Sequence, residues 1–399
     1  PVGSAKISTS NNNSPIMISA GGSGDVRLAG GIRPESYAQV VARESDVTIE
    51  ASGSILANAS NSIGGFGTNG NASIQSGLDL VLQANNGDII FTGGNAFGAY
   101  AAATATQTGN MTVQALNGAV QCLGGSSTSG NSSVTLITQR GGNIEISSDS
   151  LNFSAGTGVN AQVTVFAAAY QGVGHIEATI SNDVVISGAS IATGIGGGEI
   201  TFNAMGDITF QNALVSTKSV NGNQQIVLSS GPVNNITFTD VTMSTLLGNI
   251  EMIAGDSISY INSKFHATVP AMGAFSAIAG NDLAFDALSS VTVKGQVQPA
   301  ALFVVDNNNP MSVGSGQFVY PIGAHITAPA SGFVRIYTAA RMINNVQVMA
   351  NINGLNYVPS FPAGMNTNQE VWNTAYPTVP AFPENGSDHF TIYYKSINN

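Results

Sequence analysis

Few residues in this 399-residue chain have the type and spacing that catalysis requires. Histidines can serve as bases or metal ligands, but the four in this sequence stand far apart: His175, His266, His325 and His389. Glycosidases act through a pair of carboxylates, whereas the aspartates here mostly stand alone at turns or strand ends: Asp79, Asp88, Asp149, Asp183, Asp207, Asp240, Asp256, Asp282 and Asp286. We therefore predict no catalytic residue, no cofactor and no metal site, and so a protein that is not an enzyme.

Two patterns leave a bound cation as an alternative. The segment GGSGDVRLA (21–29) is similar to a calcium-binding nonapeptide repeat, but Asp25 comes one residue early and no tandem copy follows. The turn aspartates Asp88, Asp207 and Asp256 could align along one edge of a repetitive fold as an acidic column. Solvated turn residues are the simpler interpretation, because aspartate is common in turns for conformational reasons.

Composition excludes several classes of protein. The net charge is −11 and the 11 basic residues are scattered, so the chain lacks the basic surface that nucleic acid needs. The single cysteine, Cys122, excludes an intrachain disulfide. Cys122 stands two residues after Val120, so in a strand both side chains would point to the same inward side, which predicts that Cys122 lies in the core. No apolar run reaches the roughly 18 residues of a transmembrane helix. We expect a processed, exported protein, since the chain begins at Pro1 and has few charges.

One sequence motif, which we call the phrase, recurs along the chain. The elements that it forms would have to position any functional residue. In ITFNAMGDITF (200–210), apolar residues alternate, a Gly-Asp turn follows, and the alternation resumes. Ten copies can be aligned, and their first apolar residues are Ile16, Val47, Leu80, Met111, Val134, Val163, Ile200, Ile226, Ile250 and Phe275. The copies are about 29 residues apart on average, a spacing typical of solenoids. Stretches of variable length, such as 60–71 and 100–110, are predicted to be loops.

The third apolar position of the phrase is small. It is Ala in eight copies and Thr or Ser in the other two, Thr138 and Ser230. Residues at alternate positions of a strand share a face, so two large side chains and one small one point inward before the chain turns. A narrow coil needs a small residue at its corner. The phrase therefore predicts an all-β fold, a parallel β-solenoid of about ten or more turns whose strands stack in parallel.

The same phrases resemble the repeats of filamentous-haemagglutinin-type adhesins and autotransporter passengers. The similarity rests on ITFNAMGDITF (200–210), NIEMIAGDSISY (249–260) and LVLQANNGDIIF (80–91), and it extends over residues 15–295. The resemblance implies a right-handed parallel β-helix that is displayed on the bacterial cell surface. The scaffold alone does not imply one function, because many unrelated activities use it.

Three segments are expected along the chain. Residues 1–14 are predicted to be a flexible N-terminal arm, 15–355 the β-helix, and 356–399 a C-terminal cap or assembly segment rich in proline and aromatic residues. Within the second segment, 34–45 can be a strand or a short helix, with strand favoured. The segments 301–320 and 334–346 each have the composition of a further turn.

Function is expected to be structural and extracellular, as a self-assembling filament subunit or as an adhesin. An arm at one end and a hydrophobic strand at the other would permit head-to-tail contacts between copies, which build open filaments. The residues expected to make the contact are Trp372, Phe390, Ile392 and Tyr394. The alternative is a cap over the last turn. A second functional class stays open: a β-helix that binds host or surface glycans or degrades a polysaccharide.

Overall fold

The computed structural model describes most of the chain. The described residues are 4–9, 14–31, 36–59, 70–95, 98–126, 132–158, 160–218, 224–268, 273–296, 299–309, 314, 316–321, 323–329, 333–340, 351–352, 355–356, 370–371, 374–378 and 390–396. These residues form strands, turns and coil. Within them, no helix has the length and hydropathy that would let it span a membrane.

The chain divides into two compact units. The first comprises Pro1–Ala204 and Asn212–Val220, and the second comprises Met205–Gln211 and Asn221–Asn399. Within each unit the chain winds in turns of three short strands, and each strand pairs with its counterparts in the neighbouring turns. We call the three resulting sheets face A, face B and face C, in the order in which the chain passes through them.

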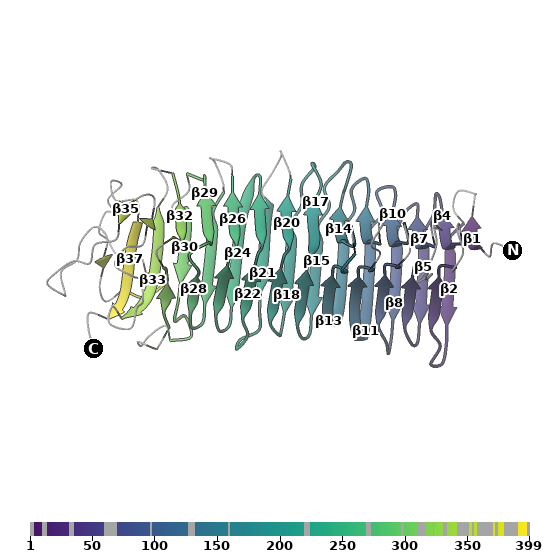
Figure 1. Cartoon of the computed structure of the whole chain (residues 1–399), viewed down its shortest axis with the longest axis horizontal. Helices are drawn as coiled ribbons and strands as arrows, with labels where there is room; N and C mark the ends of the chain where they lie inside the picture. Colours follow the sequence, from purple (N-terminus) through teal and green to yellow (C-terminus); the bar gives the residue numbers. More distant parts are fainter. Residues whose placement is uncertain are drawn as a thin grey trace. The chain divides into compact units, whose positions relative to one another are not determined.

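The first unit holds strands of all three faces, and Figure 1 labels strands of faces A and B in it, such as β4 and β5. Face A contains β1 (Ala5–Thr9), β4 (Ala38–Ala42), β7 (Ala72–Ser76), β10 (Ala101–Ala105), β12 (Val134–Thr138), β14 (Val163–Ala167), β17 (Ala189–Thr193) and β20 (Leu214–Thr217). Face B contains β2 (Ile16–Ala20), β5 (Val47–Ala51), β8 (Leu80–Ala84), the first halves of β11 (Met111–Leu123) and β13 (Ile144–Ser154), β15 (Ile176–Ile180) and β18 (Ile200–Ala204). Face C contains β3 (Val26–Ala29), β6 (Ile55–Asn58), β9 (Ile89–Thr92), the second halves of β11 and β13, and β16 (Val184–Ser187).

The second unit repeats this pattern. Face A contains β23 (Thr242–Thr245), β26 (Lys264–Ala267), β29 (Ser290–Val293), β32 (His325–Thr327) and β34 (Asn351–Ile352). Face B contains β21 (Gln224–Ser229), β24 (Gly248–Ala254), β27 (Phe275–Ala279), β30 (Ala301–Val304), β33 (Val334–Ala340) and β37 (Phe390–Ser396). Face C contains β19 (Ile208–Gln211), β22 (Ile236–Thr239), β25 (Ile258–Ile261), β28 (Leu283–Phe285) and β31 (Phe318–Val319). Two short strands are added, β35 (Leu355–Asn356) and β36 (Glu370–Val371).

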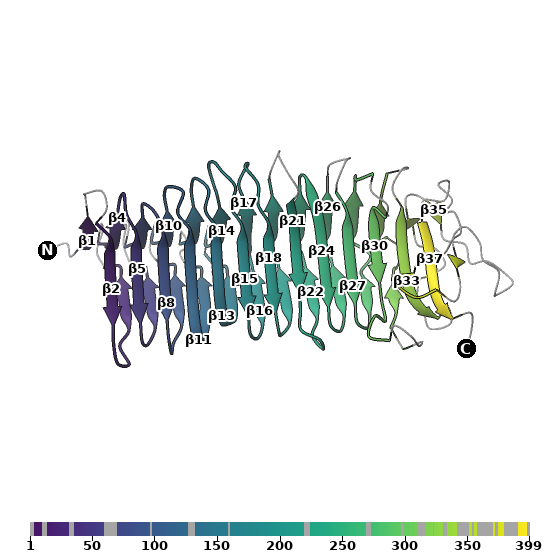
Figure 2. The same ribbon diagram turned by 180° about the vertical axis from the view of Figure 1, so that it is seen from behind.

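Pairing along each face is parallel and almost entirely in register. In face B of the first unit, Ile16 aligns with Val47, Val47 with Leu80, and Leu80 with Met111. Figure 2 shows this stacking from behind, for example β5 beside β8. Among the strand pairs that the structure describes within each unit, only β34 and β35 run antiparallel. These parallel faces confirm the predicted β-solenoid, with seven described face B strands in the first unit and six in the second.

Alternation along each strand builds the core. The inward positions of β5 and β8 are fully buried, and their outward neighbours are partly exposed. The small third position is confirmed in face B, where Ala20, Ala51, Ala84 and Ala115 stack on one another. Cys122 aligns with Phe91 and Phe153 in the core, and burial raises the pKa of its thiol.

The second unit fills its core with aromatic rings. On face C, Phe238 stacks between Phe210 and Tyr260, with ring centroids 5.7 and 5.5 Å away. Tyr260 in turn stacks on Phe285 at 4.5 Å. Phe265 of face A meets both Phe238 and Tyr260 edge-on. These rings interlock the turns, since stacked and edge-on pairs add to the stabilisation that burial provides.

The spacing of the turns changes where one connection shortens. From Ile16 to Ile176, face B strands begin 31 to 33 residues apart, but Ile200 follows Ile176 after only 24. The connection from face C to face A accounts for the difference. Residues 59–71 make it between β6 and β7, and Gly188 alone makes it between β16 and β17. Gly188 has a φ of 66°, which glycine adopts without strain.

The repeat assignment needs one correction. The copies at Val134 and Val163 lie on face A as β12 and β14, whereas the other copies lie on face B. In these turns the face B strands are β13 and β15. Strands of both faces alternate in the same way and end in a small residue before a turn, so the phrase does not distinguish them. The predicted loop at 100–110 is also wrong in part, because Ala101–Ala105 is strand β10.

Several segment predictions can be compared with the strands. Residues 34–45 contain a strand, as favoured, and the segments 301–320 and 334–346 contribute β30, β31 and β33. The N-terminal residues differ from expectation, since Ala5–Thr9 of the predicted arm pairs with β4 as strand β1. Of the predicted loop at 60–71, residues 60–69 lie outside the described residues.

Candidate functional site

Polar residues at the corners form ladders that tie consecutive turns together. At five successive face B strands of the first unit, the residue just before the strand accepts a hydrogen bond from the backbone N–H of its counterpart one turn later. The acceptors are Asp46, Asp79, Asn110, Asn143 and His175, with donor–acceptor distances of 2.7 to 3.1 Å. Such bonds satisfy corner amides that no strand pairs. The residues therefore act as structural groups of the coil.

His175 belongs to this ladder as an imidazole acceptor. The backbone N–H of His175 donates to the Asn143 side-chain oxygen. The imidazole Nδ1 of His175 accepts a hydrogen bond from the backbone N–H of Glu199 at 3.0 Å. The ring nitrogen that accepts must be unprotonated. His175 thus takes the place that asparagine holds one turn earlier, and this hydrogen bond accounts for its presence in the turn.

Replacing His175 tests the ladder directly. We expect His175→Ala to lower the free energy of unfolding by about 1 kcal/mol, because the Glu199 amide loses its acceptor. His175→Asn should cost clearly less, because a side-chain oxygen can replace Nδ1 as it does at Asn143. Urea denaturation of the two variants and the parent checks this. Equal losses from Asn and Ala would show that the imidazole acts through packing.

A second ladder precedes face C and contains two of the three aspartates expected in an acidic column. In the first unit, Asp88 accepts from the N–H of Ala119 at 2.8 Å, and Ser54 accepts from that of Asp88 at 3.1 Å. In the second unit, Asp207 accepts from the N–H of Asn235 at 2.7 Å. Asp256 lies one residue before the ladder position, which Ser257 occupies instead. The Ser257 hydroxyl accepts a hydrogen bond from the backbone N–H of Asp282.

The acidic column therefore does not form as expected. Within each unit, other residues such as Ser54 and Asn235 stand between the aspartates of this ladder, so carboxylates do not follow one another on successive turns there. Among the described residues, no group of three or more His, Cys, Asp and Glu side chains could hold a metal ion. Asp25, from the calcium-like segment, accepts from the Ser54 N–H at 2.9 Å and pairs with Arg27 at 2.8 Å. These two contacts, the Ser54 hydrogen bond foremost, lower the pKa of its carboxyl group.

The C-terminal strand occupies a different place from the one expected of an assembly surface. β37 pairs in parallel with β33, so Phe390 aligns with Val334 and Ile392 with Ile336. Ile392 and Tyr394 are fully buried in the chain's own core. Nothing further is described of the Phe390 side chain, and Trp372 and His389 lie outside the described residues. The strand thus continues the parallel ladder of face B.

The outer side of β37 is covered as well. Tyr393 stacks on Tyr337 with ring centroids 4.6 Å apart, and Tyr376 meets Tyr337 edge-on. The Tyr337 hydroxyl donates to the Thr378 carbonyl at 3.1 Å. Residues 374–378 therefore pack over the last described strands of face B.

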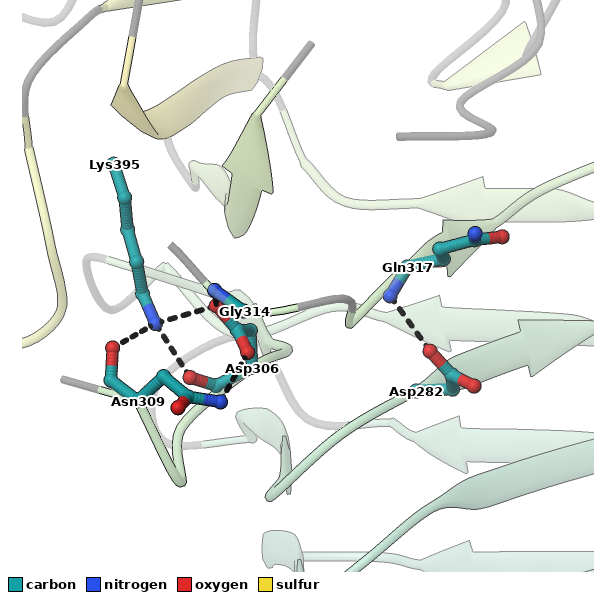
Figure 3. A network of polar contacts seen from close by, with 6 residues as sticks. All are labelled: Asp282, Asp306, Asn309, Gly314, Gln317 and Lys395. Atoms are coloured by element: carbon teal, nitrogen blue, oxygen red, sulfur yellow. Dashed lines mark hydrogen bonds and ion pairs between the residues drawn. The ribbon is translucent and has the colours of Figure 1, made fainter. Parts of the chain in front are cut away.

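A buried ion pair fastens this strand, and we call its residues the C-terminal latch: Asp306, Asn309, Gly314 and Lys395 (Figure 3). The Lys395 ammonium lies 2.9 Å from Asp306 Oδ2 and donates to the carbonyls of Asp306 and Asn309. Asp306 also accepts from Gly314 N–H and from the Asn309 amide, each at 2.8 Å. Asp306 is fully buried, and the Lys395 side chain is 8% exposed. The two buried charges of the latch, the Asp306 carboxylate and the Lys395 ammonium, therefore compensate each other.

Sequence reasoning did not single out Asp306 or Lys395. A signal was present, because Asp306 follows directly after an apolar strand in ALFVVDNNNP (301–310), where a carboxylate would be buried. A buried carboxylate requires a partner. Eighty-nine residues separate the pair in the chain, so the partner could not be identified from sequence spacing.

The N-terminal edge, which we define as the outer edge of β1, β2 and β3, is open, in contrast to the covered C-terminal strand β37. Within the described residues, each of these strands pairs on one side only, with β4, β5 and β6. The inward residue Ile7 is 52% exposed, whereas its partner Val40 in the next turn is 2% exposed. Among the described residues this edge presents unpaired backbone groups together with the uncovered side chain of Ile7, whereas the inward residues Ile16, Val26 and Leu28 are buried.

Comparison with models of known families, with curated proteins and with solved structures finds no match for this chain. Assignment of a function therefore rests on the residues described above.

Proposed function

We propose that this chain is a structural protein of the bacterial cell exterior that stacks end to end with further copies of itself. The N-terminal edge carries the proposal. It combines an open strand edge with the exposed side chain of Ile7. A strand of a second copy would pair with the open edge and cover Ile7. The resemblance of the repeats to surface-displayed β-helices supports the location.

The roles of the chemically competent residues support a structural function. His175, Asp88 and Asp207 cap backbone amides between turns, and Cys122 lies in the core. The latch groups Asp306 and Lys395 compensate each other inside the second unit. Each of these groups has a structural partner that accounts for it.

Head-to-tail stacking follows from the polarity of the strands. Face strands pair in parallel within each unit, so a copy added in the same orientation would continue the ladder at the usual spacing of about 4.8 Å. On the side of β37 away from β33, β36 pairs with Ile392 and Tyr393, and the Thr374 N–H donates to the Tyr394 carbonyl at 2.9 Å. A contact between two different ends is heterologous and builds an open filament.

The backbone of Met17 offers a selective test. The Ile16 N–H donates to the Asp46 carbonyl in the next turn. Backbone groups of successive residues in a strand point to opposite sides, so the N–H and C=O of Met17 face the open edge. Met17→Pro removes that donor, which an edge strand tolerates when the N–H points to solvent. We expect filaments of the full chain in negative-stain electron microscopy and their loss, or shortening at least tenfold, in Met17→Pro.

The matched control is Met17→Thr, which removes the same apolar side chain but keeps the N–H, and it should still form filaments. Circular dichroism would verify that both variants keep the fold of the parent. Monodisperse single particles from the unaltered chain would refute end-to-end assembly. A closed dimer would refute the head-to-tail arrangement, because identical edges would then meet.

A further inference from the structure

Face A of the second unit presents basic and hydroxyl side chains to solvent. We call Lys264, His266, Lys294 and His325 the basic row. Lys264 aligns with Ser290, and Ser290 aligns with His325, so these side chains follow one another on adjacent strands. The remaining outward residues of β23, β26, β29 and β32 are neutral: Thr242, Ser244, Ser290, Thr292 and Thr327.

The basic row lacks carboxylate partners in the described part of the chain. Lys264, Lys294 and His325 are exposed, and the structure gives none of them an ion pair. Partial burial lowers the pKa of His266, and the charges of Lys264 and Lys294 lower it further. Lys264 lies two residues before His266 on β26, and Lys294 follows Val293, which aligns with Ala267 on the adjacent strand. In a chain with 11 basic and 22 acidic residues, Lys264 and Lys294 thus place two lysine charges on one face without an ion-pair partner among the described residues.

Face B of the first unit has the opposite character. Glu145 and Glu177 point outward and align on the adjacent strands β13 and β15, and both are exposed. We call these two residues the acidic pair. The other outward residues of face B in this unit include no lysine or arginine: Met17, Ser19, Thr48, Glu50, Val81, Gln83, Thr112, Gln114, Ser147, Thr179, Thr201 and Asn203.

Two like charges directly opposite one another on neighbouring strands destabilise a sheet. Neither carboxylate of the acidic pair has an ion-pair partner among the described residues, and Thr112 and Thr201 flank them in the same row. The repulsion is thus left uncompensated within the chain. A cationic partner from outside would relieve it.

We infer that copies of this chain associate side by side, with the basic row of one copy against the acidic pair of another. Both faces carry mainly short polar side chains, which allow two sheets to approach face to face at about 10 Å. Opposite potentials would orient the copies and fix which faces meet. The contact uses the sides of the coils, so it does not depend on the proposed end-to-end stacking.

The test uses the full chain carrying Met17→Pro, so that end-to-end contacts are weakened in every sample. In sedimentation velocity, this chain should associate at about 0.01 M salt and dissociate at about 0.15 M, where the screening length falls from about 30 Å to about 8 Å. Association that is insensitive to salt would contradict the inference.

Charge reversal then identifies the faces. Glu145→Lys with Glu177→Lys leaves both faces basic, and Lys264→Glu with Lys294→Glu leaves both acidic. Each double variant alone should associate at least tenfold more weakly at low salt. Their equimolar mixture should recover association, because every contact between the two kinds of chain is again complementary.

Failure of the mixture to recover would overturn the inference, as would undiminished association of either variant alone. Neutral versions, Glu145→Gln with Glu177→Gln, guard against misfolding of the reversed chains and should also weaken association. A chain that stays monomeric at low salt but binds an anionic polysaccharide through the basic row would overturn the inference in favour of that ligand.

Discussion

Replacing Lys395 with methionine is expected to lower the stability of the C-terminal strand by about 3 to 5 kcal/mol. The substitution leaves the Asp306 carboxylate fully buried without its counter-ion, and it also removes the donor to two backbone carbonyls. An isolated buried charge is far more costly than a missing ion pair. Hydrogen exchange at the amides of Ile392, Tyr393 and Tyr394 measures the effect where the strand opens.

Two controls separate the buried charge from the loss of a long side chain. Asp306→Asn combined with Lys395→Met removes both charges, so it should restore much of the protection that Lys395→Met loses. Lys294→Met changes an exposed lysine of the same unit and should stay within about 0.5 kcal/mol of the parent. If the double variant exchanged as fast as Lys395→Met, the latch would be acting through packing and not through charge.

Truncating Phe238 to alanine should destabilise the second unit by about 3 to 5 kcal/mol. Phe238 is fully buried and contacts the rings of Phe210, Tyr260 and Phe265. Its removal leaves a cavity between three turns that rigid neighbours fill poorly. Urea denaturation followed by tyrosine fluorescence would report the loss, because Tyr260 stacks directly on this ring.

Phe166→Ala is the matched control in the first unit. Phe166 lies at an outward position of β14 and is only partly buried, so we expect a loss of about 1 kcal/mol or less. Comparable losses at the two positions would contradict the view that inward rings of face C hold the second unit together.

Most of the fold could be predicted from the sequence because the governing signal is local. Alternating apolar residues, a small residue and a Gly-Asp or Gly-Asn turn repeat within a few positions, and stacking then follows. The number of strands per turn was harder to infer. Face A strands such as Ala101–Ala105 consist largely of alanine and threonine, and they resemble loops in composition.

The candidate site could be predicted only in part. The turn aspartates Asp88 and Asp207 were identified from their Gly-Asp context, but their hydrogen-bond partners lie one turn away and depend on register. The C-terminal strand was identified by its alternation, whereas its burial depends on contact with β33, at the end of a long separation in sequence. Residues such as Asp306 and Lys395 meet only in the folded chain.

The corner ladders of the first unit have a direction. In each bond the side chain belongs to the earlier turn and the backbone N–H to the later one, as from Asp79 to Asn110 and from Asn110 to Asn143. A finished turn therefore offers acceptors already aimed at the amides of the turn that follows. Folding that begins at the amino end of this unit adds each new turn to a prepared template, whereas in growth from the carboxyl end each added turn would have to bring its acceptor side chain into place.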